Sequence, residues 1–163
     1  MEKLLKKRSK SAFETKSPSE NAKKALFIAE EICKAKGLRL TRLRYGVLQK
    51  VWESETPAGA YEILNALLPD FPKAAAVSVY RALDFLTEYG LIHRLPDQKG
   101  FIGCRFPEEE HIPAFLTCSV CGKVEEIKID KAYKEMKKAA ASLKFKTKKA
   151  AVGLYGVCPK CRN

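Results

Sequence analysis

Two Cys-x-x-Cys pairs constrain this chain more than any other feature of its sequence. The four residues are Cys118, Cys121, Cys158 and Cys161. Each pair places two thiolates on one tight turn beside a small turn-forming residue, Gly122 or Pro159, where both sulfurs can reach one Zn²⁺ at about 2.3 Å. Two such turns complete a tetrahedron with no open position, which is typical of structural zinc. A redox Cys-x-x-Cys or buried free thiols would not explain two copies. The site is expected to pin the last strand to its domain.

Charge and cysteine content narrow the class of protein. The chain has 163 residues, and 31 basic against 19 acidic side chains give a formal net charge of +12. That excess favours a polyanionic partner, nucleic acid first and an anionic membrane second, and a lysine-rich soluble surface is the competing interpretation. No segment approaches the roughly 18 to 20 apolar residues of a membrane span or the apolar run of a signal peptide. We therefore expect a cytosolic protein, in which disulfides are rare and six cysteines favour metal.

Periodicity divides the chain into two folded units. Residues 1–20 are expected to form a basic flexible arm. Helical patterns follow from Asn21 to about Lys36, from Thr41, from Thr56-Pro57 to Pro69, and from about Ala74 to Tyr89. The runs LIHRL and FIGCRF, separated by PDQKG, predict a β-hairpin. Beyond it come two strand-like runs, a helix from about Lys131 to Leu143, and the strand-like AAVGLYGV.

These elements predict an α+β fold of two domains. Helices followed directly by a hairpin indicate a winged helix-turn-helix, expected over residues 21–106. A hinge linker is expected at residues 107–112. A small α/β domain with the four-cysteine site is expected over residues 113–163.

The fourth helical segment has the pattern of a DNA-reading helix. Its apolar stripe consists of Val79, Ala82, Leu83 and Leu86. Arg81 projects roughly opposite that stripe, flanked by Tyr80 and Ser78 near the N-terminal end, which is the end that enters the major groove in a helix-turn-helix. Arginine can bind guanine bidentately, and tyrosine and serine suit phosphate or thymine contacts. An amphipathic helix with an ordinary exposed arginine is the competing interpretation.

The remaining metal-binding side chains are candidates for a second metal site, and incidental histidines are the competing interpretation. His93 and Cys104 lie in the two strands of the predicted hairpin, and His111 lies in the predicted linker. The fourth ligand could be Glu125 or Glu126, since strand alternation does not choose between them. Such a set of nitrogen, sulfur and oxygen donors favours Zn²⁺ over Mn²⁺ or Mg²⁺. Cys33, on the apolar face of the first helix, is expected to be a core thiol.

Taken together, these segments resemble the ferric uptake regulator family, and within it the zinc uptake regulator branch. The resemblance runs from about Asn21 to Cys161 and is carried by GLRLTRLRYGVL, SVYRALDFL, GLIHR and the paired Cys-x-x-Cys with CGKVEE. It implies a winged helix, a dimerisation domain, structural zinc at the paired cysteines and a second, regulatory metal at the domain hinge.

The resemblance also assigns individual residues. It implies that the regulatory zinc is bound by His93, Cys104, His111 and Glu126. It points to Tyr61, Tyr80 and Arg81 as DNA contacts, with Arg39 and Arg44 near the DNA backbone. Iron- and peroxide-sensing relatives usually carry several histidines before the first Cys-x-x-Cys, whereas EEEHIPAFLTC holds only His111.

The expected function is therefore that of a homodimeric, zinc-responsive repressor of zinc-uptake genes, binding a palindromic DNA operator with two zinc ions per chain. A relative responding to iron, manganese or peroxide is the first alternative. An enzyme is not expected, because both sites are four-coordinate and no histidine remains as a base; nor is a small organic substrate or a membrane partner. A basic zinc protein that binds RNA or serves a structural role is the remaining alternative.

Overall fold

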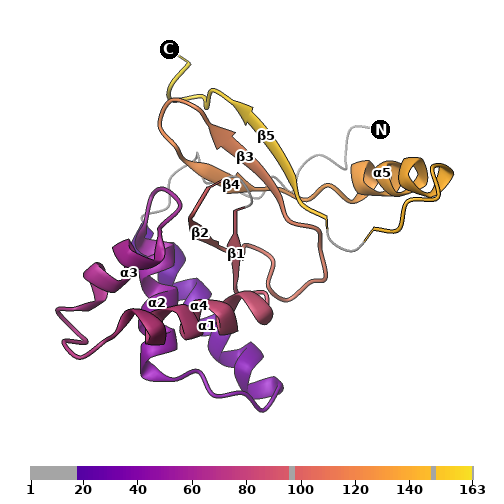
Figure 1. Ribbon diagram of the computed structural model, residues 1–163. Coiled ribbons are helices and arrows are strands. Elements are labelled where there is room, and N and C mark those ends of the chain that lie inside the picture. The colour runs from indigo at the N-terminus through magenta and orange to yellow at the C-terminus, as the bar shows by residue number, and fades with distance from the viewer. Residues whose placement is uncertain (1–17, 96–97, 148–149, 163) are drawn as a thin grey trace.

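Helices α1 to α4 pack around the main hydrophobic core (Figure 1). Their bounds are Pro18–Ala35, Arg42–Glu53, Ala60–Leu67 and Ala76–Glu88. The computed structural model describes residues 18–95, 98–147 and 150–162. The periodicity placed the core correctly, since Leu48, Ile63 and Leu83 are at most 1% exposed. Cys33 is buried in the same core, as predicted.

The starts of the first two helices follow local chemistry. Thr41 is the N-cap of α2, and its hydroxyl accepts a hydrogen bond from the backbone N–H of Arg44 at 3.3 Å, as the sequence predicted. Helix α1 begins at Pro18, so the prediction of a flexible arm was wrong for residues 18–20, where proline is suited to a first helical turn. Residues 1–17 of the predicted arm lie outside the described residues.

Helix α3 begins later than its sequence indicated. The predicted start at Thr56-Pro57 was wrong, because the backbone of Ala58 pairs instead with Phe101, with N–H···O distances of 3.1 and 2.9 Å in the two directions. Gly59 is the N-cap, and its N–H donates to the Glu62 carboxylate at 2.7 Å. The segment before α3 therefore lies outside the helix.

The hairpin forms the predicted wing. Strands β1 (Ile92–Arg94) and β2 (Phe101–Gly103) are antiparallel. The Trp52 indole of α2 lies directly on Gly103: a Cβ added there would come within 2.0 Å of Trp52 Cε2. Only glycine leaves room for this contact, which holds β2 against the helices.

The second unit is a three-stranded sheet of order β4-β3-β5. Its strands are β3 (Ala114–Cys118), β4 (Val124–Glu126) and β5 (Val152–Gly156). Strand β3 pairs antiparallel with β4 and parallel with β5, and the crossover to β5 contains α5 (Asp130–Ser142), which lies to one side of the sheet (Figure 1). The predicted α+β fold class is confirmed. Among the described residues, no helix has the length and apolar character needed to span a membrane.

Candidate metal centres and nucleic-acid interface

Four side chains from separate elements meet between the wing and the sheet; we call them the hinge cluster. They are His93 of β1, Cys104 just after β2, His111 of the linker and Glu126 of β4. Glu126 Oε1 lies 2.8 Å from His93 Nε2 and 2.7 Å from His111 Nε2, and Cys104 Sγ lies 3.6 Å from His111 Nε2. All four potential ligand atoms lie within 4.8 Å of one another. The donors converge on one point, as a metal site requires.

Neighbouring groups orient these donors. His111 Nδ1 lies 2.8 Å from the Glu109 carbonyl oxygen, which can only accept, so Nδ1 carries the proton and Nε2 is left as a free ligand. The Arg105 backbone N–H donates to Glu126 Oε2 at 2.8 Å, and its guanidinium binds Glu125 at 2.6 Å. The structure therefore directs Glu126 into the cluster and Glu125 away from it, the choice that alternation left open. Arg105 was not found from the sequence, where no spacing marks it.

Burial and charge raise the pKa of one acidic member of the cluster together and oppose one another at the other. Burial, and then the neighbouring Glu126 carboxylate, raise the pKa of the Cys104 thiol to about 12. Burial would also raise the pKa of Glu126, but hydrogen bonds from His93 and the Arg105 backbone, with the charges of His93 and His111, together outweigh it and the pKa is lowered. The cluster thus holds a carboxylate beside a protonated thiol, and a cation binding there would displace the thiol proton.

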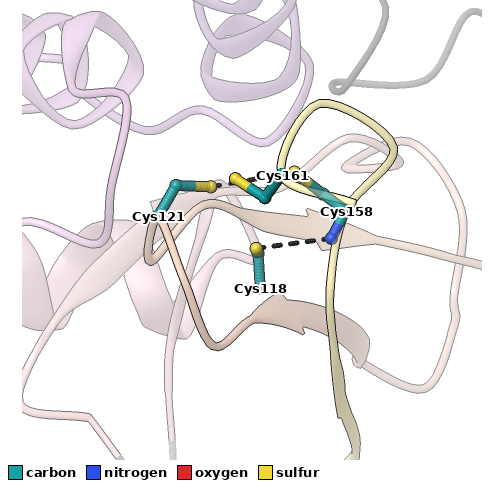
Figure 2. A group of neighbouring side chains, drawn as sticks. All are labelled: Cys118, Cys121, Cys158 and Cys161. Carbon is teal, nitrogen blue, oxygen red and sulfur yellow. Dashed lines mark hydrogen bonds between the residues drawn. The ribbon is translucent and has the colours of Figure 1, made fainter. Parts of the chain in front are cut away.

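The four cysteines of the paired motifs form a second cluster (Figure 2). Cys118 ends β3 and Cys121 lies on the following turn, while Cys158 and Cys161 follow β5. Cys121 Sγ lies 3.8 Å from Cys158 Sγ, and the Cys158 backbone N–H donates to Cys118 Sγ at 3.3 Å. The turn needs Gly122, whose φ is +71°.

The thiols of this four-cysteine cluster share negative charge unequally. Hydrogen bonds from the backbone N–H groups of Cys121 and Cys158 lower the pKa of Cys118 to about 6. Cys161, next to the other sulfurs, has its pKa raised to about 12. One thiolate is therefore available at neutral pH, and a bound divalent cation would draw off the remaining protons. Four sulfur donors with no nitrogen or oxygen donor suit Zn²⁺.

The face of α4 opposite the core carries the predicted DNA-reading side chains. Val79, Ala82, Leu83 and Leu86 are buried, as the stripe predicted, while Arg81 is exposed and Tyr80 is 45% exposed. Ser78 is half-buried beside them. Tyr61 of α3 joins Tyr80 edge-to-face, with ring centroids 6.5 Å apart. Tyr61, Tyr80 and Arg81 therefore share one exposed surface.

The two other arginines of the predicted interface differ from one another. Arg39 is exposed. The Arg44 guanidinium instead lies 3.5 Å from the centre of the Phe85 ring and donates to the Arg39 carbonyl at 2.6 Å. Arg44 thus joins the start of α2 to α4 through a cation–π contact, which sequence periodicity did not indicate.

Comparison with known proteins gives a consistent result. The family model described as "Ferric uptake regulator family" matches residues 35–155. The zinc uptake regulation protein of Escherichia coli is 32% identical over 134 residues, covering 82% of this chain and 78% of the relative. The peroxide-responsive repressor PerR of Staphylococcus aureus is 28% identical over 78% of this chain and 84% of the relative.

Solved structures match this chain with different TM-scores. A zinc uptake regulator complexed with zinc and DNA matches with a TM-score of 0.80 at 30% identity, covering 86% of this chain and 94% of that one. Holo XcZur matches at 0.76, with 31% identity and coverage of 83% and 95%. Apo XcZur matches at only 0.52, with 29% identity and coverage of 88% and 99%. The present arrangement is therefore closer to the holo form than to the apo form.

Proposed function

This chain belongs to the ferric uptake regulator family, and from that premise we propose that it is a zinc-responsive DNA-binding repressor of zinc-uptake genes, with zinc as co-repressor. The observation that carries the proposal is the hinge cluster, because its four donors come from the wing, the linker and the sheet. The similarity to the zinc- and DNA-bound regulator supports it.

Two zinc ions per chain are assigned, with different roles. The structural zinc is bound by Cys118, Cys121, Cys158 and Cys161. The regulatory zinc is bound by His93, Cys104, His111 and Glu126, whose mixed donors include one thiol, a ligand that harder cations do not favour.

The proposed switch follows from where the ligands lie. A ligand shifts a conformational equilibrium only by its differential affinity for the two states. Wing and sheet supply ligands to one cluster, so these donors converge in only one relative orientation of the two domains. Binding therefore selects that orientation, and the greater similarity to holo than to apo XcZur supports this reading.

DNA recognition is assigned to the exposed face of α4 and its surroundings. Arg81 is proposed to read a base in the major groove, with Ser78, Tyr80 and Tyr61 beside it. Arg39 and Arg44 are proposed to lie near the DNA backbone. Arg44, held on Phe85, fixes the reading helix in position.

A homodimer is proposed through the second domain. Strand β5 is at the edge of its sheet, and Leu154 and Tyr155 on it are 57% and 58% exposed. Such an apolar edge favours pairing with a second copy. Two-fold symmetry would place two reading helices on successive major grooves, about 34 to 36 Å apart, on a palindromic site.

The alternative functions within this family differ in the signal to which the regulator responds. A regulator responding to iron, manganese or peroxide is the alternative, and the Cys104 thiol in the hinge cluster disfavours it. Members of this family are transcription regulators, which supports a non-enzymatic role for this chain.

The test is DNA binding at buffered metal activities. Duplexes selected from a random pool with the zinc-loaded protein would provide the operator, and fluorescence anisotropy would give its affinity. We expect zinc to raise that affinity by at least about tenfold, and Fe²⁺ or Mn²⁺ at their buffered cellular levels to have little effect. Equal responses to all three metals, or no response to zinc, would exclude the proposal.

A further inference from the structure

The loop between α2 and α3 contacts the four-cysteine cluster at a place separate from the hinge cluster. Glu55 Oε2 of this loop lies 2.8 Å from Nζ of Lys123, the second residue after Cys121. Next to it, a Cβ added at Gly122 would lie 3.6 Å from Thr56 Cγ2, which is van der Waals distance. The loop and the Cys118–Cys121 turn are therefore packed against one another.

Charge at this contact comes from both cysteine turns. Hydrogen bonding and charge from Lys123 lower the pKa of Glu55, and Lys160, between Cys158 and Cys161, lowers it further. The carboxylate is thus paired with Lys123 on the first cysteine turn, and the charge of Lys160 on the second turn adds to the attraction. Glu55 belongs to the helical unit and both lysines belong to the sheet unit, so their attraction acts between the two units.

Another part of the boundary is incompletely packed. A cavity of about 210 Å³ lies between the wing residues Leu95 and Gln98 and the sheet residues Phe115 and Tyr155, among others. An interface with such a gap does not fix a domain angle by close packing. Discrete contacts are then needed to fix the angle between the domains, and the Glu55–Lys123 pair is one such contact.

We propose that the Cys118–Cys121 turn is a second docking point for the DNA-binding domain, and that Glu55 and Lys123 are positioning residues that stabilise the zinc-bound orientation. The inference rests on the proposed function. It gives the structural zinc an additional role, because the zinc would hold the turn that places Lys123 where Glu55 can reach it. The hinge cluster then closes onto an orientation that this ion pair already favours.

Linkage makes the proposal measurable without DNA. Any contact formed only in the zinc-bound orientation raises the affinity of the hinge site for zinc. Exposed ion pairs have small effects, and Glu55 is 63% exposed. We therefore expect Glu55→Lys and Lys123→Glu each to weaken zinc binding at the hinge by roughly two- to five-fold.

The experiment is a competition between the full-length dimer and a chelator, with the four-cysteine zinc retained, for wild type, both single variants and the double reversal Glu55→Lys/Lys123→Glu. The double reversal keeps the wild-type net charge and should restore the affinity. Unchanged affinity in both single variants, or no recovery in the double reversal, would overturn the proposal.

Anisotropy with the selected operator provides the second readout. Glu55→Lys raises the net charge by two and Lys123→Glu lowers it by two, so a simple effect on attraction to phosphate would move DNA affinity in opposite directions. The proposal instead requires both variants to reduce the gain that zinc produces. If Lys123→Glu loses the four-cysteine zinc, Glu55→Lys alone decides the matter.

Failure of this inference is distinguishable from failure of the proposed function. If the wild-type protein responds to zinc and the single variants respond equally, only the proposed second docking point is excluded. If the hinge of the wild-type protein binds no zinc, both the second docking point and the proposed function are excluded.

Discussion

At the residue scale, the role of each cluster depends on where its side chains originate in the fold. His93 and Cys104 come from a two-stranded wing, whereas Glu126 comes from a separate sheet, so one ion would join parts that no strand pairing joins. The four cysteines instead lie on two turns at one end of a single sheet. The first arrangement suits a switch and the second suits a fixed support.

Replacing Cys104 should abolish the zinc response. Cys104→Ser removes the thiolate, the ligand that most favours zinc, so we expect DNA affinity to stay at its zinc-free level while the dimer remains intact. Anisotropy at buffered zinc and analytical ultracentrifugation would check both. Cys33→Ser makes the same chemical change outside both clusters and should retain the response. A Cys104→Ser protein with wild-type zinc dependence would remove Cys104 from the site.

Replacing Arg81 should weaken operator binding without affecting metal. A bidentate arginine–guanine contact contributes about 1–3 kcal/mol, so Arg81→Ala is expected to raise Kd roughly 5- to 150-fold. Lys134→Ala on α5 removes the same charge from the other domain and serves as the control. Zinc content and far-ultraviolet circular dichroism should be unchanged. Equal affinities for wild type and Arg81→Ala would show that the arginine reads no base.

At the element scale, local patterns predicted the type of every helix and strand in the described residues but not every boundary. Thr41 begins α2 because a hydroxyl cap acts within three residues. Thr56-Pro57 carried a similar local signal, yet the distant Phe101 pairs with the backbone next to it. The helical pattern extended to Pro69, yet α3 ends at Leu67, and the C-cap Leu68 is 39% exposed. Boundaries set by distant contacts have no signal in nearby sequence.

In the candidate sites, too, some residues could be grouped from local sequence, whereas others are brought together only by distant contacts. Spacing alone was sufficient to group the four cysteines, and the two wing strands were sufficient to associate His93 with Cys104. Glu126 could be chosen only by resemblance, because the deciding contact is the Arg105 backbone N–H, 21 residues away. The Glu55–Lys123 pair joins two loops of different domains, and no periodicity reports such a contact.

The wing offers a direct test of one element contact. Gly103→Ala would force a methyl group into the Trp52 indole, so we expect the protein to lose about 1–3 kcal/mol of stability. Urea unfolding followed by fluorescence of Trp52, the one tryptophan of the chain, would measure it. Gly156→Ala, where an added Cβ meets nothing within 4 Å, is the matched control. Equal unfolding midpoints would mean that the wing shifts to accept the methyl group.

At the scale of the whole molecule, the proposed metals should differ in how readily they leave. The four-cysteine site is closed by sulfur alone, whereas the hinge site opens when the domains separate. Elemental analysis of the reduced protein should therefore give two zinc ions per chain before mild chelation and one after it. Size-exclusion chromatography should show that the dimer persists. A single zinc that resists chelation would keep the structural site and exclude the regulatory one.

The hairpin of β3 and β4 has a consequence for the order in which metal is acquired. Its turn carries Cys118 and Cys121, and its second strand ends at Glu126, opposite Phe115. In the proposed scheme, a newly made chain must take up one zinc ion before the carboxylate of its sensor has a fixed position. In this scheme, each copy of the repressor binds one zinc ion at its structural site before it can respond to zinc at the hinge. A zinc-starved cell that makes more of this protein would lower its free zinc further. Repression would then be delayed until the structural sites of the new chains are filled.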